Sequence, residues 1–317
     1  MEKIKIDKDE FTPLTKEEKN IEAIVRPSVG YWKDAWQRLK RDRMALVSLV
    51  VALLIILSAI FVPVIFEKIL GYTYDSTNLS LANNKPSLEH WFGTDQLGRD
   101  ILVRVFFGAR YSLIIAIAAA FINLVIGILY GGIAGYFGGT VDNIMMRIVD
   151  IIYSIPLTIY VIIFMAILNK PGANGSGLWT IILALSISYW IGMARIVRGD
   201  VLQLKQQEFV LAARSLGVSK FKILLRHLIP NSIGSIMVTL TLLIPEAVFT
   251  EAFLSFIGLG LTPPKASLGT LANEAMAGIY SFPYQLVPPA IAICLIILTF
   301  NLFGDGLNDA LDPKNKR

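Results

Sequence analysis

The side chains that could carry out chemistry are few, and their spacing does not assemble a catalytic or metal site. The sequence has one cysteine, Cys294, and two histidines, His90 and His227, which are far apart. A disulfide framework or a cysteine-based metal site needs partners that this sequence lacks, and no zinc-binding spacing is present. Segment 93–98 has the glycine spacing of a phosphate-binding loop, but arginine and aspartate follow where lysine and serine or threonine are required. We therefore expect a chain that is not an enzyme and itself binds no cofactor or metal.

Two carboxylates, Glu246 and Glu251, lie within a long apolar run. A carboxylate at membrane depth is costly, and it often marks a transport pathway, an interface or an ion pair. The alternative is that Pro245 unwinds the helix locally, so that both carboxylates reach interfacial water or backbone N–H groups. The residues alone leave both interpretations open.

A charged segment between two apolar runs, Arg195–Pro230, is the most informative part of the chain. Its pattern predicts one short helix over about Gln207–Leu216 and a second over about Lys220–Leu228, which Pro230 ends. Gly217 suits a left-handed turn after the first helix, where a side chain would clash. Ser219 can then cap the second helix.

A helix–glycine–helix unit of this kind would present a small, rigid surface outside the membrane. Ala212 and Ala213 have minimal side chains, so a groove on another protein could approach the backbone closely there. The alternative is an amphipathic loop that packs on its own membrane domain. Spacing favours neither interpretation over the other.

The elements that position these residues are long uncharged runs. Of the residues, 55% are hydrophobic, and the mean hydropathy is +0.61. A bilayer core of about 30 Å needs about 20 helical residues to cross it, and lipid offers no partner for unpaired backbone groups. Six membrane-spanning helices are predicted, at about Met44–Phe66, Ala109–Tyr136, Met145–Leu168, Leu178–Ile196, Asn231–Gly258 and Leu286–Leu307.

Basic residues set the expected orientation. Six spans place both termini on one side, and with that side inside, the inner segments hold 22 of the 29 lysines and arginines and the outer segments hold 7. Because cytoplasmic segments carry the excess of positive charge, we expect a multi-pass protein of the cell membrane with cytoplasmic N- and C-termini. The net charge of +5 is thereby attributed to topology and not to nucleic acid.

Three further patterns concern the packing of these spans. Pro63, Pro156 and Pro245 fall at membrane depth, and each should kink or break its helix. The glycine run 127–135 contains G-x-x-x-G spacing, which permits close helix packing within the chain or against a second membrane subunit. Aromatic and basic residues alternate before the first span, which fits either a helix at the membrane surface or an ordinary solvated helix.

The segment LAARSLGVSKFKILLRHLIPN resembles the cytoplasmic loop of ABC importer permeases, with its EAA-x-x-x-G core. In that family the loop forms a coupling helix that docks into a cleft of the ATPase subunit. Leu211 stands where the family usually has glutamate, which bears on charge pairing with the ATPase but leaves docking by shape and apolar contact available. The resemblance implies an ATPase-coupling role for Glu208, Ala212, Ala213, Arg214, Gly217, Ser219, His227 and Pro230.

Further segments narrow the resemblance to oligopeptide and dipeptide permeases of the C type. The resemblance runs from about Trp32 to the end of the chain and implies import of oligopeptides or dipeptides. Nickel and glutathione importers share these motifs, so their permeases are alternatives. An autonomous secondary transporter is a further alternative, which would call for internal repeats and buried ion-coupling residues. The matching segments are HWFGTDQLGRD at 90–100, GARYSL at 108–113, EAFLSFIGLG at 251–260 and FNLFGDGLNDALDP at 300–313.

We therefore expect an all-α, polytopic membrane protein with six transmembrane helices and the type I ABC importer permease fold. The resemblance implies as partners a second homologous permease, two cytoplasmic ATPases that use ATP and magnesium, an extracytoplasmic peptide-binding protein and membrane lipid. The expected organisation is a cytoplasmic tail with an interfacial helix at 1–43, the first span and an extracytoplasmic segment at 44–106, a five-helix core at 107–310 that includes a coupling loop at 197–230, and a cytoplasmic tail at 311–317.

Overall fold

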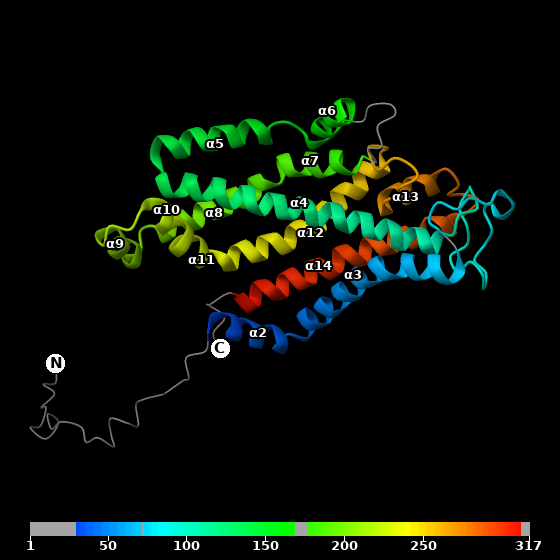
Figure 1. Cartoon of the computed structure of the whole chain (residues 1–317), viewed down its shortest axis with the longest axis horizontal. Coiled ribbons are helices and arrows are strands. Elements are labelled where there is room, and N and C mark those ends of the chain that lie inside the picture. The colour runs from blue at the N-terminus through cyan, green and yellow to red at the C-terminus, as the bar shows by residue number, and fades with distance from the viewer. Residues whose placement is uncertain (1–29, 72, 169–176, 312–317) are drawn as a thin grey trace, which may run out of the picture.

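The computed structural model describes residues 30–71, 73–168 and 177–311, and the described chain is almost entirely helical. Long helices run side by side along the molecule (Figure 1). The helical loop between the fourth and fifth spans lies at one end, and the segment 71–100 lies at the other. Predictions for the tail before residue 30, the link 169–176 and the tail after residue 311 lie outside the described residues.

The chain enters the bundle through α2 (Tyr31–Arg41) and α3 (Arg43–Leu70). Asp42 separates the two helices, and its carboxylate accepts hydrogen bonds from the N–H groups of Met44 and Ala45 at 2.9 and 3.2 Å, which caps α3. Ala45 and Leu39 pack against Ala310 near the end of the last helix. The described start and end of the chain therefore meet at the same end of the bundle.

The second span, α4 (Ile101–Phe137), begins eight residues earlier than the apolar run predicted. Asp100 determines this start, because its carboxylate accepts a hydrogen bond from the Val103 N–H at 3.0 Å. A helix of 37 residues is about 55 Å long, which exceeds a hydrocarbon core of about 30 Å. The first turns of α4 therefore extend beyond the membrane, where segment 71–100, with its short turn η2 (Leu79–Leu81), surrounds them.

The third span is a bent pair of helices, α5 (Gly139–Tyr153) and α6 (Leu157–Leu168), which meet at an angle of 78°. The break contains Pro156, as its missing N–H predicts. The α3 and α12 helices instead continue through Pro63 and Pro245, so only one of the three prolines breaks its helix. Five continuous helical stretches in the described residues are long and apolar enough to span a membrane. With the bent pair counted as one further span, the described residues contain six candidate membrane spans.

The fourth span consists of α7 (Leu178–Ser188) and α8 (Trp190–Leu204). It continues eight residues beyond the predicted end at Ile196, through part of the segment expected to form the coupling loop. Val197 and Val201 of this stretch are fully buried in the bundle, and α5 supplies acidic partners for Arg195 and Arg198. Arg195 pairs with Asp150 at 3.2 Å, and Arg198 pairs with Asp142.

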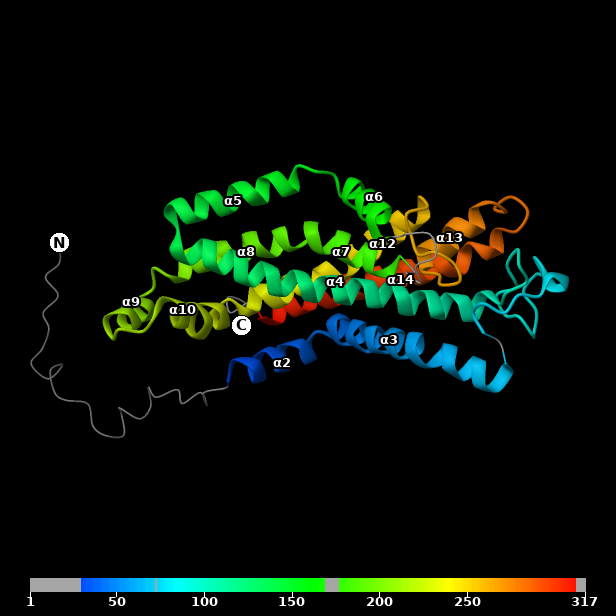
Figure 2. The same ribbon diagram turned by 45° about the horizontal axis from the view of Figure 1, so that its top comes forward.

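The fifth and sixth spans are α12 (Ile233–Phe256) and α14 (Val287–Leu311). Between them lie α13 (Leu268–Met276) and the short turn η4 (Pro283–Gln285). The main apolar core contains buried side chains from α3, α4, α7, α12, α13 and α14. Figure 2 shows α4 between α3 on one side and the α7–α8 span on the other.

The glycine run of α4 packs against α8 of the same chain. A Cβ atom at Gly131 would overlap the carbonyl oxygen of Ala194, and one at Gly135 would lie 2.8 Å from the carbonyl oxygen of Arg198. Only glycine lets the two backbones approach this closely. The structure thus assigns the glycine run to packing within the chain.

Candidate functional site

The helical loop between α8 and α12 begins with α9 (Glu208–Ser215) and α10 (Lys220–Ile223), at the end of the bundle where α2 also lies (Figure 1). The predicted left-handed turn is confirmed, since Gly217 has a φ of +74°. The Gly217 N–H donates to the Arg214 carbonyl at 2.9 Å, and the Val218 N–H donates to the Ala213 carbonyl at 3.1 Å. This pair of bonds is the Schellman arrangement. A Cβ at Gly217 would meet no atom within 4 Å, so backbone conformation and not crowding requires glycine.

The second half of the loop differs from the prediction at two residues. Ser219 occupies the N-cap position of α10, but its side chain makes no capping hydrogen bond. Pro230 does not end the helix, because the chain continues through the π-helical turn η3 (Leu224–Leu228) into α11 (Ile229–Asn231). The Ile229 N–H donates to the carbonyl of Leu224, five residues back. The wider turn relieves the clash that proline makes in an ordinary helix.

One face of α9 and α10 is buried against the bundle. Val210, Ala213 and Ile223 pack on side chains of α4 and α8. Ala213 is only 7% exposed, so its small side chain serves packing within the chain. This differs from the expectation that Ala213, like Ala212, is presented to a partner. Neighbouring residues of a helix point about 100° apart, so Ala212 lies on the exposed side.

The opposite face carries large apolar side chains in solvent. Leu216 is 83% exposed and Leu211 is 52% exposed. Exposed apolar groups on a rigid unit often mark a protein contact. We call four exposed residues of this loop the tip side chains: Phe209, Leu211, Leu216 and Phe221.

Three cations hold the loop against the C-terminal end of α4. The Arg214 guanidinium lies over the Tyr136 ring at 5.5 Å, and the Lys220 ammonium lies over the Phe137 ring at 5.9 Å. Both distances fall within the range of cation–π attraction. Lys205 donates to the Gly135 carbonyl at 2.7 Å, near the C-terminal end of the helix, where a cation is favoured. These contacts attach the loop to the end of the bundle.

An ion pair that the sequence did not reveal joins α5 to α8 near this loop. Arg198 donates from Nε and Nη2 to the two carboxylate oxygens of Asp142, at 2.5 and 2.7 Å. The bidentate geometry orients both side chains. The two residues are separated by 56 positions in the chain, so no local spacing could have paired them.

The eight residues predicted for the coupling role therefore divide into three groups. Glu208, Ala212, Arg214 and Gly217 lie on α9 or its turn and are exposed. His227 and Pro230 lie on η3 and α11, on the return toward α12, and the remaining two are the inward-facing Ala213 and the N-cap Ser219.

Glu251 is fully buried, and neither interpretation from the sequence describes its surroundings. Its carboxylate accepts hydrogen bonds from the hydroxyl groups of Ser112 and Ser255, both at 2.7 Å. Ser255 also contacts the Ser267 hydroxyl at 3.2 Å, and the Leu268 N–H donates to Ser112 at 3.3 Å. Glu251 thus links α4, α12 and the start of α13. Glu246 lies on an exposed face of the same helix and does not take part.

A charged cluster at the opposite end of the bundle also escaped the sequence analysis. Arg104 Nη1 lies 2.5 Å from Asp95 Oδ2 and 2.7 Å from Glu274 Oε2, and Arg99 contacts the same two acids. These residues line a cavity of about 410 Å³ between segment 71–100 and α13. The glycines of segment 93–98 are needed for close backbone packing, since a Cβ at Gly98 would overlap the Asn78 carbonyl. Segment 93–98 is therefore a tightly packed loop.

Within the described residues, no group of three or more histidine, cysteine, aspartate or glutamate side chains is placed to hold a metal ion.

Comparison with known proteins identifies two matching families. Residues 125–317 match the family described as binding-protein-dependent transport system inner membrane component. Residues 30–86 match the N-terminal transmembrane domain of oligopeptide transport permease C.

Curated relatives match nearly the whole chain. The oligopeptide transport system permease protein OppC of Bacillus subtilis is 48% identical, over 98% of this chain and 99% of its own length. The dipeptide transport system permease protein DppC of the same organism is 45% identical, over 98% of this chain and 94% of its own length. The glutathione transport system permease protein GsiD of Escherichia coli is 44% identical, over 90% of this chain and 91% of its own length.

A solved structure shows the same fold at low sequence identity. It is that of the MetNI methionine ABC transporter in an inward-facing conformation, with a TM-score of 0.55 and 18% identity. The match covers 67% of this chain and 98% of the other chain.

Proposed function

The chain belongs to the family of binding-protein-dependent transport system inner membrane components, and from this premise we propose that it is the permease subunit of an ABC importer for oligopeptides or dipeptides. The chain is a multi-pass membrane protein and a non-catalytic component of the transporter. It forms part of the pathway, while hydrolysis of ATP with magnesium belongs to separate ATPase subunits.

The proposed assembly contains a second, homologous permease, two cytoplasmic ATPases and an extracytoplasmic peptide-binding protein. The end of the bundle that carries α2, α9 and α10 faces the cytoplasm in this proposal. The distribution of basic residues supports that orientation, because 22 of the 29 lysines and arginines fall in the segments assigned to this side. Segment 71–100 and α13 then face the exterior, where the binding protein delivers its cargo.

In the proposed mechanism, α9 and its Gly217 turn dock on an ATPase subunit. Closure of the two ATPases on ATP displaces the docked loops. Because Arg214, Lys220 and Lys205 fix the loop to the inner end of α4, the displacement moves α4 and α8 together. The pathway thereby opens toward the exterior to receive a peptide.

A single observation carries this proposal. The tip side chains are large, apolar and exposed, although they lie on α9, α10 and the turn between them, which three cations hold against the bundle. A loop that merely packed on its own membrane domain would turn these side chains inward. Leu211 fits docking by apolar contact at the position where the family usually has glutamate.

Substitution of Leu216 by aspartate tests the docking role. Leu216 is 83% exposed, so the change removes an apolar contact and adds a charge without disturbing the core. Co-purification of the ATPase subunits with the permease should fall by about tenfold or more, since one buried leucine contributes about 1.5–3 kcal/mol.

The matched control is Leu88→Asp at the opposite end of the molecule, where Leu88 is 96% exposed. This variant should retain the ATPase subunits at the unsubstituted level, and both variants should insert into the membrane normally. Equal retention of the ATPases by Leu216→Asp and Leu88→Asp would contradict the proposal.

A further inference from the structure

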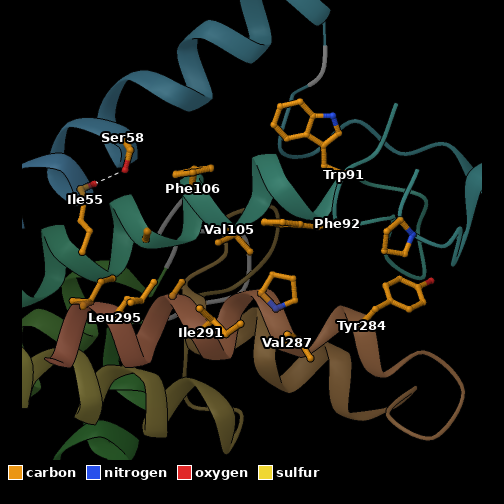
Figure 3. Close-up of a pocket in the computed structure, with 15 residues that line it drawn as sticks. Ile55, Ser58, Trp91, Phe92, Val105, Phe106, Tyr284, Val287, Ile291 and Leu295 are labelled. Carbon is orange, nitrogen blue, oxygen red and sulfur yellow. Dashed lines mark hydrogen bonds between the residues drawn. The ribbon is translucent and has the colours of Figure 1, made fainter. Parts of the chain in front are cut away.

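An apolar cleft of about 460 Å³ opens between α3, α4 and α14, toward the end of the bundle that carries segment 71–100. Ile55 and Ser58 of α3 form one wall, and Ile291 and Leu295 of α14 form the facing wall, as Figure 3 shows. Phe106 of α4 lies between them. In Figure 2, the half of α3 nearer to segment 71–100 leans away from α4, which leaves this space open. We refer to this space as the α3 cleft.

The α3 cleft offers no side-chain donor to a polar ligand. Only Ser58, Trp91 and Tyr284, among its lining residues, carry polar side-chain atoms, and each donates its hydrogen to a backbone carbonyl of the chain. The acceptors are the carbonyls of Ile55, Leu88 and Asn83, at 2.9, 3.1 and 2.7 Å. A peptide or sugar would lose most of its hydrogen bonds to water there, because the only side-chain groups left to it are the acceptor lone pairs of two hydroxyls. The cleft therefore suits a hydrocarbon.

The α3 cleft is continuous with the membrane-facing surface. Its walls belong to three helices that are long and apolar enough to span a membrane. Ile291 and Leu295 line the cleft and are 53% and 49% exposed, while Leu54 and Phe61 continue the exposed apolar surface along α3. Lipid tails that cover this surface can enter the cleft without crossing water.

The dimensions of the α3 cleft fit a single lipid acyl chain better than a transmembrane helix. A cleft of about 460 Å³ is close to the volume of a single helical turn with side chains, which is about 10–12 Å wide and 5.4 Å long. A membrane helix of a partner subunit would not fit. The cleft is instead elongated, because its lining on α14 extends from Val287 to Ile296, a rise of about 13–14 Å. That shape matches an extended acyl chain.

The mouth of the cleft suits a phospholipid. Trp91, which belongs to segment 71–100, lines the cleft and is 66% exposed. An indole ring is favoured at the depth of the lipid headgroups. Pro86 also lines the cleft, and the adjacent Lys85 is exposed, which places a cation where an anionic headgroup would lie.

We propose that the α3 cleft is a binding site for one acyl chain of a membrane phospholipid. The lipid fills the space between α3 and the rest of the bundle, and it belongs to the leaflet next to segment 71–100.

Photochemical labelling of the complete importer in nanodiscs tests the proposal. The probe is phosphatidylglycerol with a diazirine at the middle of one acyl chain, at a small fraction of the total lipid. Peptide mapping should show adducts concentrated on Phe106, Ile291 and Leu295, above the level at Leu54, which is 59% exposed but does not line the cleft.

Two substitutions fill the α3 cleft from opposite walls, namely Ala292→Phe and Ser58→Phe. Each should reduce the adducts at Leu295 by about tenfold or more, because a phenyl ring displaces at least two methylene groups of the lipid. Cys294→Phe is the matched control, since Cys294 is exposed at a neighbouring position of α14 and does not line the cleft. It should leave the adducts at Leu295 unchanged.

The proposal is overturned if Leu295 is labelled no more strongly than Leu54 in the unsubstituted importer. It is also overturned if both filling variants assemble and retain the adducts, or if residues of the second permease cross-link into the cleft in place of lipid. If neither filling variant assembles, the adduct map of the unsubstituted importer decides.

Discussion

Arg198 on α8 and Asp142 on α5 form a two-point ion pair, with N–O distances of 2.5 and 2.7 Å. Asp142 is buried and the Arg198 side chain is 33% exposed, so the pair is only partly screened by solvent. It lies beside the contact of Gly135 with the Arg198 carbonyl. The same arginine therefore contributes to the packing of α8 against two neighbouring helices.

The first prediction concerns this ion pair. Asp142→Asn and Arg198→Gln should each destabilise the purified permease by about 1–2 kcal/mol, because each leaves a charged or polar group without its partner. The double variant should be less destabilised than the sum of the two, by about 1 kcal/mol. Thermal unfolding of the unsubstituted permease, the two single variants and the double variant measures the coupling energy between the two side chains. Strictly additive effects would show that the ion pair contributes nothing to stability.

The second prediction concerns the left-handed turn at Gly217. Valine would force a β-branched residue into this conformation, which costs about 1–2 kcal/mol or more and favours a different turn. Uptake and stimulated ATPase activity should collapse in Gly217→Val, while the permease still inserts into the membrane.

Asparagine is the matched control at this position, because it tolerates the left-handed region better than other residues with a side chain. Gly217→Asn should therefore retain most of the uptake. Normal transport by Gly217→Val would show that the left-handed turn is not required for coupling.

The third prediction concerns the contact between α4 and α8. A methyl group at Gly131 would overlap the backbone of Ala194, so Gly131→Ala should push the helices apart and destabilise the protein by about 1–3 kcal/mol. Gly199→Ala on α8 is the control, because a Cβ there meets no atom within 4 Å. Thermal unfolding in detergent should separate the two variants clearly, and equal midpoints would contradict this packing.

The fourth prediction concerns Glu251. Alanine at this position leaves the hydroxyls of Ser112 and Ser255 without their acceptor in a buried site, at a cost of about 2–4 kcal/mol. Glutamine keeps the shape and one acceptor oxygen, and a serine hydroxyl can reorient to accept from its amide. Glu251→Gln should therefore reduce thermal stability and uptake less than Glu251→Ala does. Equal loss with both residues would indicate that the negative charge itself is required.

Sequence patterns were sufficient for the features that depend on local chemistry. Long apolar runs predicted the spans, and the glycine after Leu216 predicted the left-handed turn. Both follow from properties of consecutive residues, namely hydropathy and backbone conformation.

Features that depend on distant residues could not be predicted in the same way. The part of α8 beyond Ile196 packs Val197 and Val201 into the bundle and pairs Arg198 with Asp142 of α5, and the burial of Ala213 depends on how α9 lies against α4 and α8. The Glu251 carboxylate accepts hydrogen bonds from Ser255, four residues away on the same helix, and from Ser112 on α4, 139 positions away. Sequence reasoning offered water, backbone groups or an ion pair as its partners, because the approach of Ser112 depends on how α4 packs against α12.

The docking of α9 on a cytoplasmic ATPase is tested most directly by a single cysteine at Ala212, which is exposed on that helix. Cys294 is the one natural cysteine, so Cys294→Ser provides a background without competing thiols. Leu88→Cys in the same background is the control for the other face of the membrane.

In intact cells, a membrane-impermeant maleimide should label the Leu88→Cys protein and not the Ala212→Cys protein. In inside-out vesicles, Ala212→Cys should be labelled when the ATPases are stripped away, and a bifunctional maleimide should cross-link it to an ATPase subunit when they are present. Labelling of Ala212→Cys from outside intact cells, or its failure to cross-link to an ATPase in the assembled importer, would contradict the account.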